Sequence, residues 1–445
     1  MLDDTICAIS TPIGTGGVSI IRISGENAKC VLDKIFVDSE NKGFEPRKMR
    51  FGEVKFDNFS DQALCVYFQK PNSFTGEDVV EINLHGGYYL TKTVLDEILK
   101  MQGIRLAEPG EFSKRAVMNG KMDMSQAEAV IDMINATSLA ELRASSHVMQ
   151  GGLREKVAEI QAKLTDLICE VDVAIDYPDQ DIEYISHKEV LQRLENVINE
   201  LVNLDKTTKT GQAIKNGVTV ALAGIPNAGK SSLLNAMIGY DRAIVTDIAG
   251  TTRDSLSESY EYNGVRFNLV DTAGIRDASN AVEKIGIERA KQEVRQADLV
   301  LNIVDVTVDS TAQEIELPSN VKILKILNKI DVKSQKNMKN IDFDIKISAK
   351  NNENIQELKQ LIFENTIDSS VLNEKLLITN TRHKQCISEC INILNEVKNA
   401  INNMMPLDCL ALMLREGWMK IGQITGSNTD QVIIDRIFSK FCLGK

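Results

Sequence analysis

Apolar positions in the first hundred or so residues form short runs separated by glycine-rich turns. The runs at 18–23, 63–68 and 79–84 are rich in Val, Ile, Leu and aromatic residues, which favours β-strands. The third run ends in the glycines of His85-Gly86-Gly87, and the segment from Tyr88 to Met101 has a helical pattern. We therefore expect an α+β arrangement in this part of the chain.

From about Ser125 onward, apolar residues recur at intervals of three and four, which is the period of an amphipathic helix. Gly151-Gly152 should break or bend this stretch, and the segment from Tyr177 to Asp181 should end it. The pattern predicts further helices at 188–208, 384–405, 407–418 and 429–441. Helices thus stand on both sides of a stretch with a different pattern, which lies between them.

That intervening stretch opens with a strand-like run at 218–223. The run continues into Gly224-Ile225-Pro226-Asn227-Ala228-Gly229-Lys230-Ser231 and then into a helix-like run at 232–237. The eight residues match the phosphate-binding loop G-x-x-x-x-G-K-[ST] in the strand–loop–helix context that it requires. Glycines let backbone N–H groups point at phosphate oxygens. Lys230 would add positive charge at the β- and γ-phosphates, and Ser231 would offer a hydroxyl to Mg²⁺.

Asp271-Thr272-Ala273-Gly274 provides the next part of a nucleotide site, because it ends an apolar run at 265–270. A carboxylate at a strand end can hold Mg²⁺ through water, and the glycine N–H can sense a γ-phosphate. Thr251 and Thr252 lie between the phosphate loop and Asp271, where a switch loop should supply a further Mg²⁺ ligand.

Two later segments predict the choice of base. Asn328-Lys329-Ile330-Asp331 ends an apolar run at 321–327, and Asp331 can accept both N–H groups of a guanine edge, where adenine presents the opposite pattern. Ser348-Ala349-Lys350 resembles the guanine-loop motif of GTPases. Each short motif alone could be an ordinary turn, but four in this order predict a GTP-binding domain of the Ras-like α/β class.

The water-positioning group is not the usual one. Many small GTPases orient the attacking water with a Gln directly after the D-x-x-G glycine, and here that position is Ile275, which cannot polarise water. Glu283 is a candidate, although an acidic residue near a helix start is also favoured by the helix dipole. The side-chain oxygen of Asn227 suits a monovalent cation that neutralises developing charge. Alternatively, Asn227 only tolerates the backbone geometry of the loop.

Composition and charge argue against several classes of protein. A length of 445 residues suggests about three domains, and a net charge of −12 argues against a general nucleic-acid-coating protein, although a local basic patch is allowed. No apolar run is long enough for a membrane span, and the acidic start is neither a signal nor a transit peptide. The eight scattered cysteines and four histidines argue against a zinc site and indicate reduced, cytosolic thiols. The final Lys445 fits a prenylation signal poorly.

Together these segments resemble one family over nearly the whole chain, the bacterial and organellar tRNA uridine-modification GTPases called MnmE or TrmE. The phosphate loop alone would not separate this family from other GTPases, but the terminal Cys442-Leu443-Gly444-Lys445 and the N-terminal segments do. Besides the nucleotide motifs, the matching segments are 22–25, 71–78, 109–113, 174–178, 285–289 and 441–445.

The resemblance implies a multidomain α+β and α/β fold. Residues 1–118 would form an α+β tetrahydrofolate-binding and dimerisation domain, and 215–372 an inserted Ras-like α/β GTPase domain. Residues 119–214 and 373–445 would be the two parts of an all-α helical domain, the second carrying the terminal Cys-x-Gly-Lys motif.

The resemblance also implies an activity. The protein would be a cytoplasmic homodimer that works with a flavin-dependent partner of the MnmG or GidA type, which carries FAD, in a heterotetramer. The pair would install an aminomethyl-type (carboxymethylaminomethyl) group at C5 of the wobble uridine of certain tRNAs. A 5-formyl- or methylene-tetrahydrofolate would supply the one-carbon unit. K⁺ would pair the GTPase domains and switch hydrolysis on, and GTP hydrolysis would drive conformational change.

Site residues carry over by position. The resemblance assigns Glu283 to the attacking water and, with Lys230 and Cys442, to the catalytic set. The other implied sets are Asn227, Thr246, Ile248 and Thr251 for K⁺; Ser231 and Thr252 for Mg²⁺; and Arg22, Glu81, Lys121 and Lys445 for folate. A basic pair suits the carboxylates of the folate glutamate tail, and Glu81 suits donors on the pterin ring. The implied GTP-binding residues are Asn227, Ala228, Gly229, Lys230, Ser231, Ser232, Thr246, Asp247, Ile248, Ala249, Gly250, Thr251, Thr252, Asp271, Thr272, Ala273, Gly274, Asn328, Lys329, Asp331, Ser348, Ala349 and Lys350.

Two other functions fit parts of the chain. A ribosome-assembly GTPase would share the nucleotide motifs, but it predicts an RNA-binding domain of basic, aromatic or KH-type character, and the sequence shows none. A folate-dependent one-carbon enzyme with a vestigial nucleotide domain would not need intact Lys230, Ser231, Asp271 and Asp331.

Overall fold

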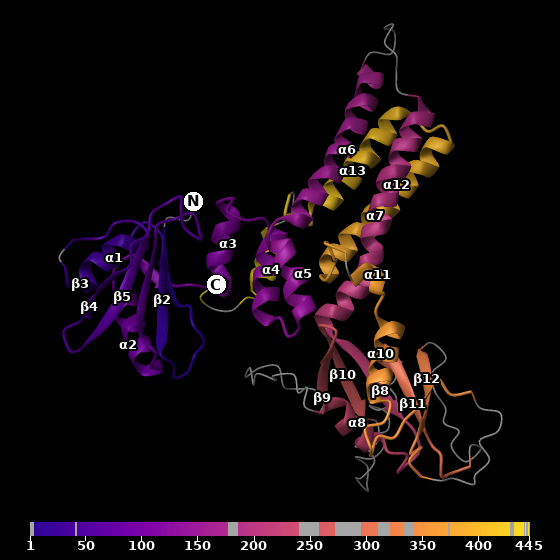
Figure 1. Ribbon diagram of the computed structural model, residues 1–445. Coiled ribbons are helices and arrows are strands. Elements are labelled where there is room, and N and C mark those ends of the chain that lie inside the picture. The colour runs from indigo at the N-terminus through magenta and orange to yellow at the C-terminus, as the bar shows by residue number, and fades with distance from the viewer. Residues whose placement is uncertain are drawn as a thin grey trace, which may run out of the picture. The chain divides into compact units, whose positions relative to one another are not determined.

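The structure is a computed structural model, shown in Figure 1, and it falls into two compact units. Unit 1 comprises residues 1–131, 149–161 and 418–445, and unit 2 comprises 132–148 and 162–417. The structure describes residues 4–40, 42–176, 186–239, 258–271, 295–309, 321–332, 342–372, 374–427, 431–439, 441 and 444.

Unit 1 is built on a seven-stranded sheet with the order β3-β4-β5-β6-β2-β1-β7. Neighbouring strands are antiparallel, apart from β1 and β7, which pair in parallel. The bounds are β1 (Thr5–Ile9), β2 (Val18–Ser24), β3 (Phe36–Asp38), β4 (Arg50–Lys55), β5 (Ser60–Phe68), β6 (Val79–His85) and β7 (Ile104–Leu106), with helices α1 (Ala28–Ile35) and α2 (Tyr88–Leu99).

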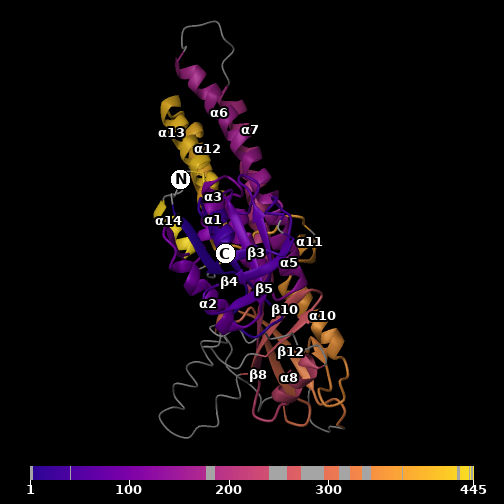
Figure 2. The same cartoon turned by 90° about the vertical axis from the view of Figure 1, so that its left-hand side faces the viewer.

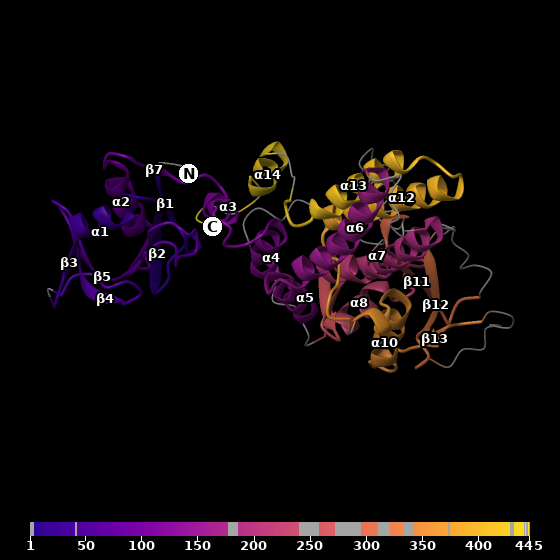
Figure 3. The same cartoon turned by 90° about the horizontal axis from the view of Figure 1, so that it is seen from above.

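Helices α1 and α2 cover one face of this sheet (Figure 3). Side chains alternate between the faces of a strand, so Ile21 and Ile23 of β2 and Ile82 of β6 are buried beneath the helices. Arg22 and Glu81, which oppose each other in register, therefore lie on the opposite face. Part of that face is covered by Phe112 of α3 (Glu111–Met118).

In unit 1, packing between further helices places the end of the chain beside its beginning. Helix α14 (Gln431–Phe438) contacts α3, and Phe438 and Phe441 form a small core with Met124 of helix α4 (Met124–Asn135). Beyond this core, the Ser10 hydroxyl donates to the Gly444 carbonyl at 3.0 Å. Residues at the two ends of the sequence thus lie side by side at β1.

Unit 2 contains a six-stranded sheet with the order β13-β12-β11-β8-β10-β9. All its strands are parallel except β9, which pairs antiparallel with β10 in a hairpin. The bounds are β8 (Val218–Ala223), β9 (Glu258–Tyr262), β10 (Val265–Asp271), β11 (Leu299–Asp305), β12 (Lys322–Asn328) and β13 (Ile345–Lys346), with helices α8 (Lys230–Ile238), α10 (Ile355–Thr366) and α11 (Ser369–Leu372). The central strands β8 and β11 are nearly continuous apolar runs because a parallel sheet is buried on both faces, whereas β10, next to the edge strand β9, alternates apolar and polar residues.

The other part of unit 2 is helical. Salt bridges join neighbouring helices of this group, which run alongside one another in Figures 1 and 2. The group contains α7 (His187–Asn216), α12 (Thr381–Asn402) and the unit 2 portions of α6 (Gly152–Asp176) and α13 (Leu407–Gly422). Helix α5 (Leu139–Met149) also belongs to unit 2 over most of its length, and its Ala144 packs into the core of the six-stranded sheet.

The elements predicted from apolar periodicity are present, and the multidomain α+β and α/β fold class is confirmed. Helix α7 extends to Asn216, beyond the predicted end at Thr208. The sequence Thr207–Gly211 resembles a helix breaker, but Gly211 is needed because any side chain there would overlap the Ile378 backbone. Among the described residues, no helix combines the length and apolarity that crossing a membrane requires.

Candidate functional site

The nucleotide motifs meet at one edge of the six-stranded sheet, because β8, β10, β12 and β13 run parallel and their carboxyl ends lie together. The phosphate loop, defined as residues 224–231, follows β8, and Asp271 and Asn328 end β10 and β12. Strand β8 lies between β10 and β11, so the order of the strands reverses there. Open α/β sheets bind ligands at such a reversal.

The phosphate loop curls around the Lys230 ammonium. Gly224 and Gly229 have φ values of +155° and +93°, and a side chain at Gly224 would come within 2.5 Å of the Ile303 carbonyl. Asn227 is also in the left-handed region. Lys230 is only 5% exposed, and its ammonium donates to the carbonyls of Gly224 and Ile225 at 2.8 and 2.9 Å. Helix α8 begins at Lys230, so its N-terminal N–H groups face the loop, as an anion site requires.

Ser231 and Asp271 are brought together although 40 residues separate them, and the Ser231 hydroxyl donates to a carboxylate oxygen of Asp271 at 3.2 Å. Mg²⁺ prefers oxygen ligands and is commonly held by one or two protein groups with water and phosphate oxygens. A hydroxyl and a carboxylate at the mouth of a phosphate loop fit that requirement.

Asn328 connects the phosphate side of the site to the base side. It is 1% exposed; its side-chain nitrogen donates to the Ala228 carbonyl at 2.9 Å, and its side-chain oxygen accepts from the Ala349 N–H at 3.1 Å. The Ser348 hydroxyl donates to Asp331 at 2.5 Å. The contact orients the Asp331 carboxylate beside the segment predicted to bind guanine.

Asp305, at the end of β11, is a residue of this site that the sequence analysis missed. The Lys329 ammonium pairs with it at 2.6 Å and also donates to the Asn227 carbonyl at 2.7 Å. Burial alone would raise the pKa of Asp305, but Lys329 and the N–H and hydroxyl donors of Thr307 hold this pKa below its usual range. Asp305 ends the apolar run 299–304 as Asp271 ends its own strand, and that position could have identified it.

Several predicted site residues lie outside the described part of the chain, so their predictions stay open. They are Thr246, Asp247, Ile248, Ala249, Gly250, Thr251, Thr252, Thr272, Ala273, Gly274, Glu283, Cys442 and Lys445.

The predicted folate residues lie in unit 1. Arg22 and Glu81 form an ion pair across β2 and β6, with nitrogen–oxygen distances of 2.7 and 2.8 Å and about a fifth of each side chain exposed. The Arg22 guanidinium also lies over the rings of Phe74 and Phe112, at 5.5 and 5.8 Å from their centroids. Direct pairing means that Arg22 and Glu81 would face the same part of a ligand.

Lys121 is held separately from this pair, because its ammonium donates to the Pro71 carbonyl at 2.9 Å. Gly444, the neighbour of Lys445, is anchored at β1, where a side chain on Gly444 would overlap the Ile9 carbonyl. The chain terminus therefore belongs to the same unit as Arg22, Glu81 and Lys121.

Comparisons with known proteins show which family this chain is similar to. Residues 5–121 match the family described as GTP-binding protein TrmE N-terminus, and residues 124–442 match the MnmE helical domain. Proteins named tRNA modification GTPase MnmE from Clostridioides difficile (strain 630) and Alkaliphilus oremlandii (strain OhILAs) are 39% and 37% identical to this chain, and each alignment covers 100% of both sequences. The solved FeoB G domain of Methanococcus jannaschii is 27% identical over 34% of this chain and 98% of that one, with a TM-score of 0.24.

Proposed function

The chain belongs to the MnmE family of tRNA modification GTPases, and on that premise we propose that it hydrolyses GTP as part of the modification of the wobble uridine of tRNA. The observation that carries the proposal is the convergence of the phosphate loop, Asp271, Asn328 and Asp331 at one sheet edge, within a chain that matches its relatives from end to end.

Different described residues bind the phosphates, the Mg²⁺ ion and the guanine base of GTP. The Lys230 ammonium and the N–H groups of the phosphate loop bind the β- and γ-phosphates. Ser231 and, through water, Asp271 would hold Mg²⁺, which would stabilise the negative charge that develops on the phosphate oxygens. Asp331, oriented by Ser348, accepts from the guanine edge.

In this proposal, a K⁺ ion would neutralise the negative charge that develops during GTP hydrolysis. Asn227 of the phosphate loop holds the cation together with Thr246, Ile248 and Thr251, and Glu283 orients the attacking water. The left-handed backbone of Asn227 fits both interpretations of this residue. Its carbonyl accepts from the Lys329 ammonium, so the proposed K⁺ role rests on the side-chain oxygen. We expect GTP hydrolysis to be much faster in K⁺ than in Na⁺, and equal rates would contradict the cation site.

We assign the folate site to Arg22, Glu81, Lys121 and Lys445, with 5-formyl- or methylene-tetrahydrofolate as the one-carbon donor. The Arg22–Glu81 ion pair changes the division of roles that residue types alone suggested. Glu81 accepts from pterin N–H groups, and Arg22 meets the same end of the ligand. Lys121 and Lys445 then form the basic pair for the glutamate tail.

The protein acts as a cytoplasmic homodimer in this proposal, with an FAD-carrying partner of the MnmG type in a heterotetramer that places the carboxymethylaminomethyl group at C5. The open sheet face of unit 1 supports a homodimer. Phe51 and Leu64 oppose each other in register there and are 53% and 41% exposed. Apolar side chains of this kind on one sheet face suit contact with a second copy.

A hydrogen bond between helix α5 and the six-stranded sheet, both in unit 2, supports coupling of GTP hydrolysis to conformational change. The β9–β10 hairpin ends at Asp271 on one side and turns at Gly264 on the other. The Gly264 carbonyl accepts from the Ala140 N–H of helix α5 at 3.0 Å. A displacement at the Asp271 end would therefore reach α5 along strand β10.

Replacement of Ala140 tests this coupling, because proline lacks an N–H yet is tolerated in the first turn of a helix. We expect Ala140→Pro to keep GTP turnover and to lower tRNA modification, and an unchanged modification rate would contradict the coupling. Ala140→Ser, which retains the N–H, is the control.

Nucleoside mass spectrometry of bulk tRNA from cells lacking the protein tests the function directly. We expect loss of the 5-substituted wobble uridine, restored by the wild-type chain but not by Lys230→Ala or Cys442→Ser. An unchanged nucleoside profile would contradict the proposed function, and ribosome profiles would then test the assembly-GTPase alternative.

A further inference from the structure

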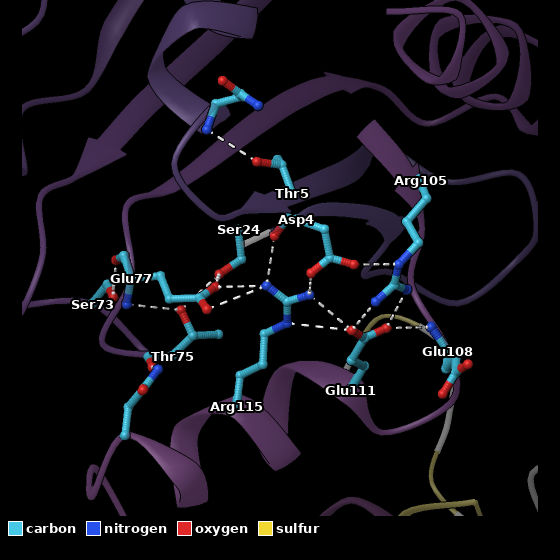
Figure 4. Close-up of polar contacts among 12 residues, drawn as sticks. Asp4, Thr5, Ser24, Ser73, Thr75, Glu77, Arg105, Glu108, Glu111 and Arg115 are labelled. Atoms are coloured by element: carbon cyan, nitrogen blue, oxygen red, sulfur yellow. Dashed lines mark hydrogen bonds and ion pairs between the residues drawn. The ribbon is translucent and has the colours of Figure 1, made fainter. Parts of the chain in front are cut away.

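Arg115 of helix α3 carries a charge in the interior of unit 1. Its side chain is 1% exposed, and it contacts three carboxylates: Asp4 at 2.7 Å, Glu111 at 2.9 Å and Glu77 at 3.2 Å (Figure 4). Arg105 also pairs with Asp4 and Glu111. A buried charge is retained only where it is paired and hydrogen-bonded, so the position of each partner is tightly constrained.

Two of these carboxylates are kept ionised by the arginines. Burial would raise the pKa values of Asp4 and Glu111, but hydrogen bonds and charge from Arg105 and Arg115 hold both pKa values below their usual range. Asp4 and Glu111 thus tie Arg115 to the start of the chain and to its own helix. Glu77 is the partner that lies outside both, in the loop of residues 71–78, which we call the 71–78 loop.

Glu77 fixes the shape of the 71–78 loop through its side chain and its backbone. The Ser24 hydroxyl donates to its carboxylate at 2.7 Å. The Glu77 N–H donates to the Thr75 hydroxyl, and the Glu77 carbonyl accepts from the Ser73 hydroxyl. Asn119 donates to the Thr75 carbonyl at 2.7 Å. The loop is therefore held from β2, from the α3 end and from within (Figure 4).

The 71–78 loop touches two of the proposed folate residues. Phe74 lies beneath the Arg22 guanidinium, and the Pro71 carbonyl holds the Lys121 ammonium. Gly76 has a φ of +78° and no side chain, and a Cβ at Gly76 would lie 3.3 Å from the Lys121 stem. Displacement of this loop would remove a contact from Arg22 and one from Lys121, although the two residues come from different parts of the sequence.

We propose that Glu77, held by Arg115, is a positioning residue that prepares Arg22 and Lys121 to bind folate. This inference rests on the proposed folate site. Glu77 acts through the 71–78 loop without touching the ligand. A preorganised site loses less conformational freedom on binding, so a loosened loop lowers affinity even though every direct contact residue is still present.

Calorimetric titration of the full-length protein with 5-formyltetrahydrofolate tests the inference. Glu77→Gln removes the charge that faces Arg115 while keeping the size of the side chain. We expect it to weaken folate binding about tenfold or more, with GTP turnover unchanged. Glu111→Gln is the matched control, because Glu111 contacts Arg115 but not the 71–78 loop. It should lower the thermal unfolding midpoint and leave folate affinity within about threefold of wild type.

Ser24→Ala provides a milder variant if Glu77→Gln does not fold, because it removes the hydrogen bonds of Ser24 with Glu77 and Thr75 of the 71–78 loop and leaves the Arg115–Glu77 ion pair intact. We expect a smaller but measurable loss of folate affinity. Wild-type affinity in folded Glu77→Gln and Ser24→Ala would overturn the inference, as would an equal loss of affinity in Glu111→Gln. Absence of binding by the wild-type protein would instead overturn the proposed folate site, and the inference with it.

Discussion

The nucleotide site of unit 2 and the proposed folate site of unit 1 are built in opposite ways. The phosphate loop supplies eight consecutive residues, and the other nucleotide motifs each follow or end a parallel strand. The folate candidates are single residues on β2, on β6, after α3 and at the chain terminus. One site is therefore assembled from short contiguous motifs, while the other is assembled from distant single positions.

This difference changes what holds each site in shape. Backbone geometry at Gly224 and Gly229 fixes the phosphate loop, and hydrogen bonds from Asn328 and Lys329 secure it. In unit 1, the 71–78 loop and a buried ionic network serve that purpose. We expect nucleotide binding to be sensitive to motif residues, and folate binding to be sensitive also to residues that touch no ligand.

Lys230→Ala should have the largest effect. It removes the charge at the centre of the phosphate loop, and loss of such a stabilising group costs about a hundredfold or more in turnover. Steady-state GTP hydrolysis measures the loss. Folate affinity should stay at the wild-type value, and a parallel loss of folate binding would show that the two sites are not independent.

Glu81→Gln should give the converse result. A charge-assisted hydrogen bond to the pterin contributes about 1.5–3 kcal/mol, so the folate dissociation constant should rise accordingly. Calorimetry with 5-formyltetrahydrofolate measures the change, and GTP turnover in the same preparation is the control. Unchanged folate affinity would remove Glu81 from the site.

Asp331→Asn should weaken the preference for GTP over ATP by about 1–3 kcal/mol, because an amide cannot accept two N–H groups of guanine. Competition between fluorescent GTP and unlabelled ATP measures the preference. Ser348→Ala, which keeps the Asp331 carboxylate but removes the hydroxyl that donates to it and accepts from the Asn351 N–H, should have a smaller effect of the same sign. An unchanged preference in Asp331→Asn would refute the assignment of the guanine contact.

Asp305→Asn should have the smallest effect. The variant keeps the shape of the side chain but loses the charge that pairs with Lys329, whose side chain is one-third exposed, so we expect a loss of about 1 kcal/mol or less in GDP affinity. Equilibrium binding of a fluorescent GDP analogue measures it. A loss of GDP affinity of about a hundredfold, as large as the loss of turnover expected for Lys230→Ala, would contradict this. It would mean that β11 holds the phosphate loop more strongly than the backbone geometry of the loop indicates.

Sequence alone predicted the residues proposed to bind the nucleotide, and it determined most of the strands and helices. Phosphate binding depends on local backbone geometry, which glycine spacing encodes, and strand and helix periods are local properties too. The domain limits and the residues around Thr246–Thr252 and Glu283 remain predictions.

Tertiary structure alone revealed the pairing of Asp305 with Lys329, the full length of α7, the Arg22–Glu81 pair and the network around Arg115. Each depends on contacts between residues far apart in the sequence. Asp4 and Arg115 illustrate the physical reason, because an exposed ion pair and a buried one have the same letters in a sequence. Only the fold decides which charges lose their water, and therefore which partners must be fixed in place.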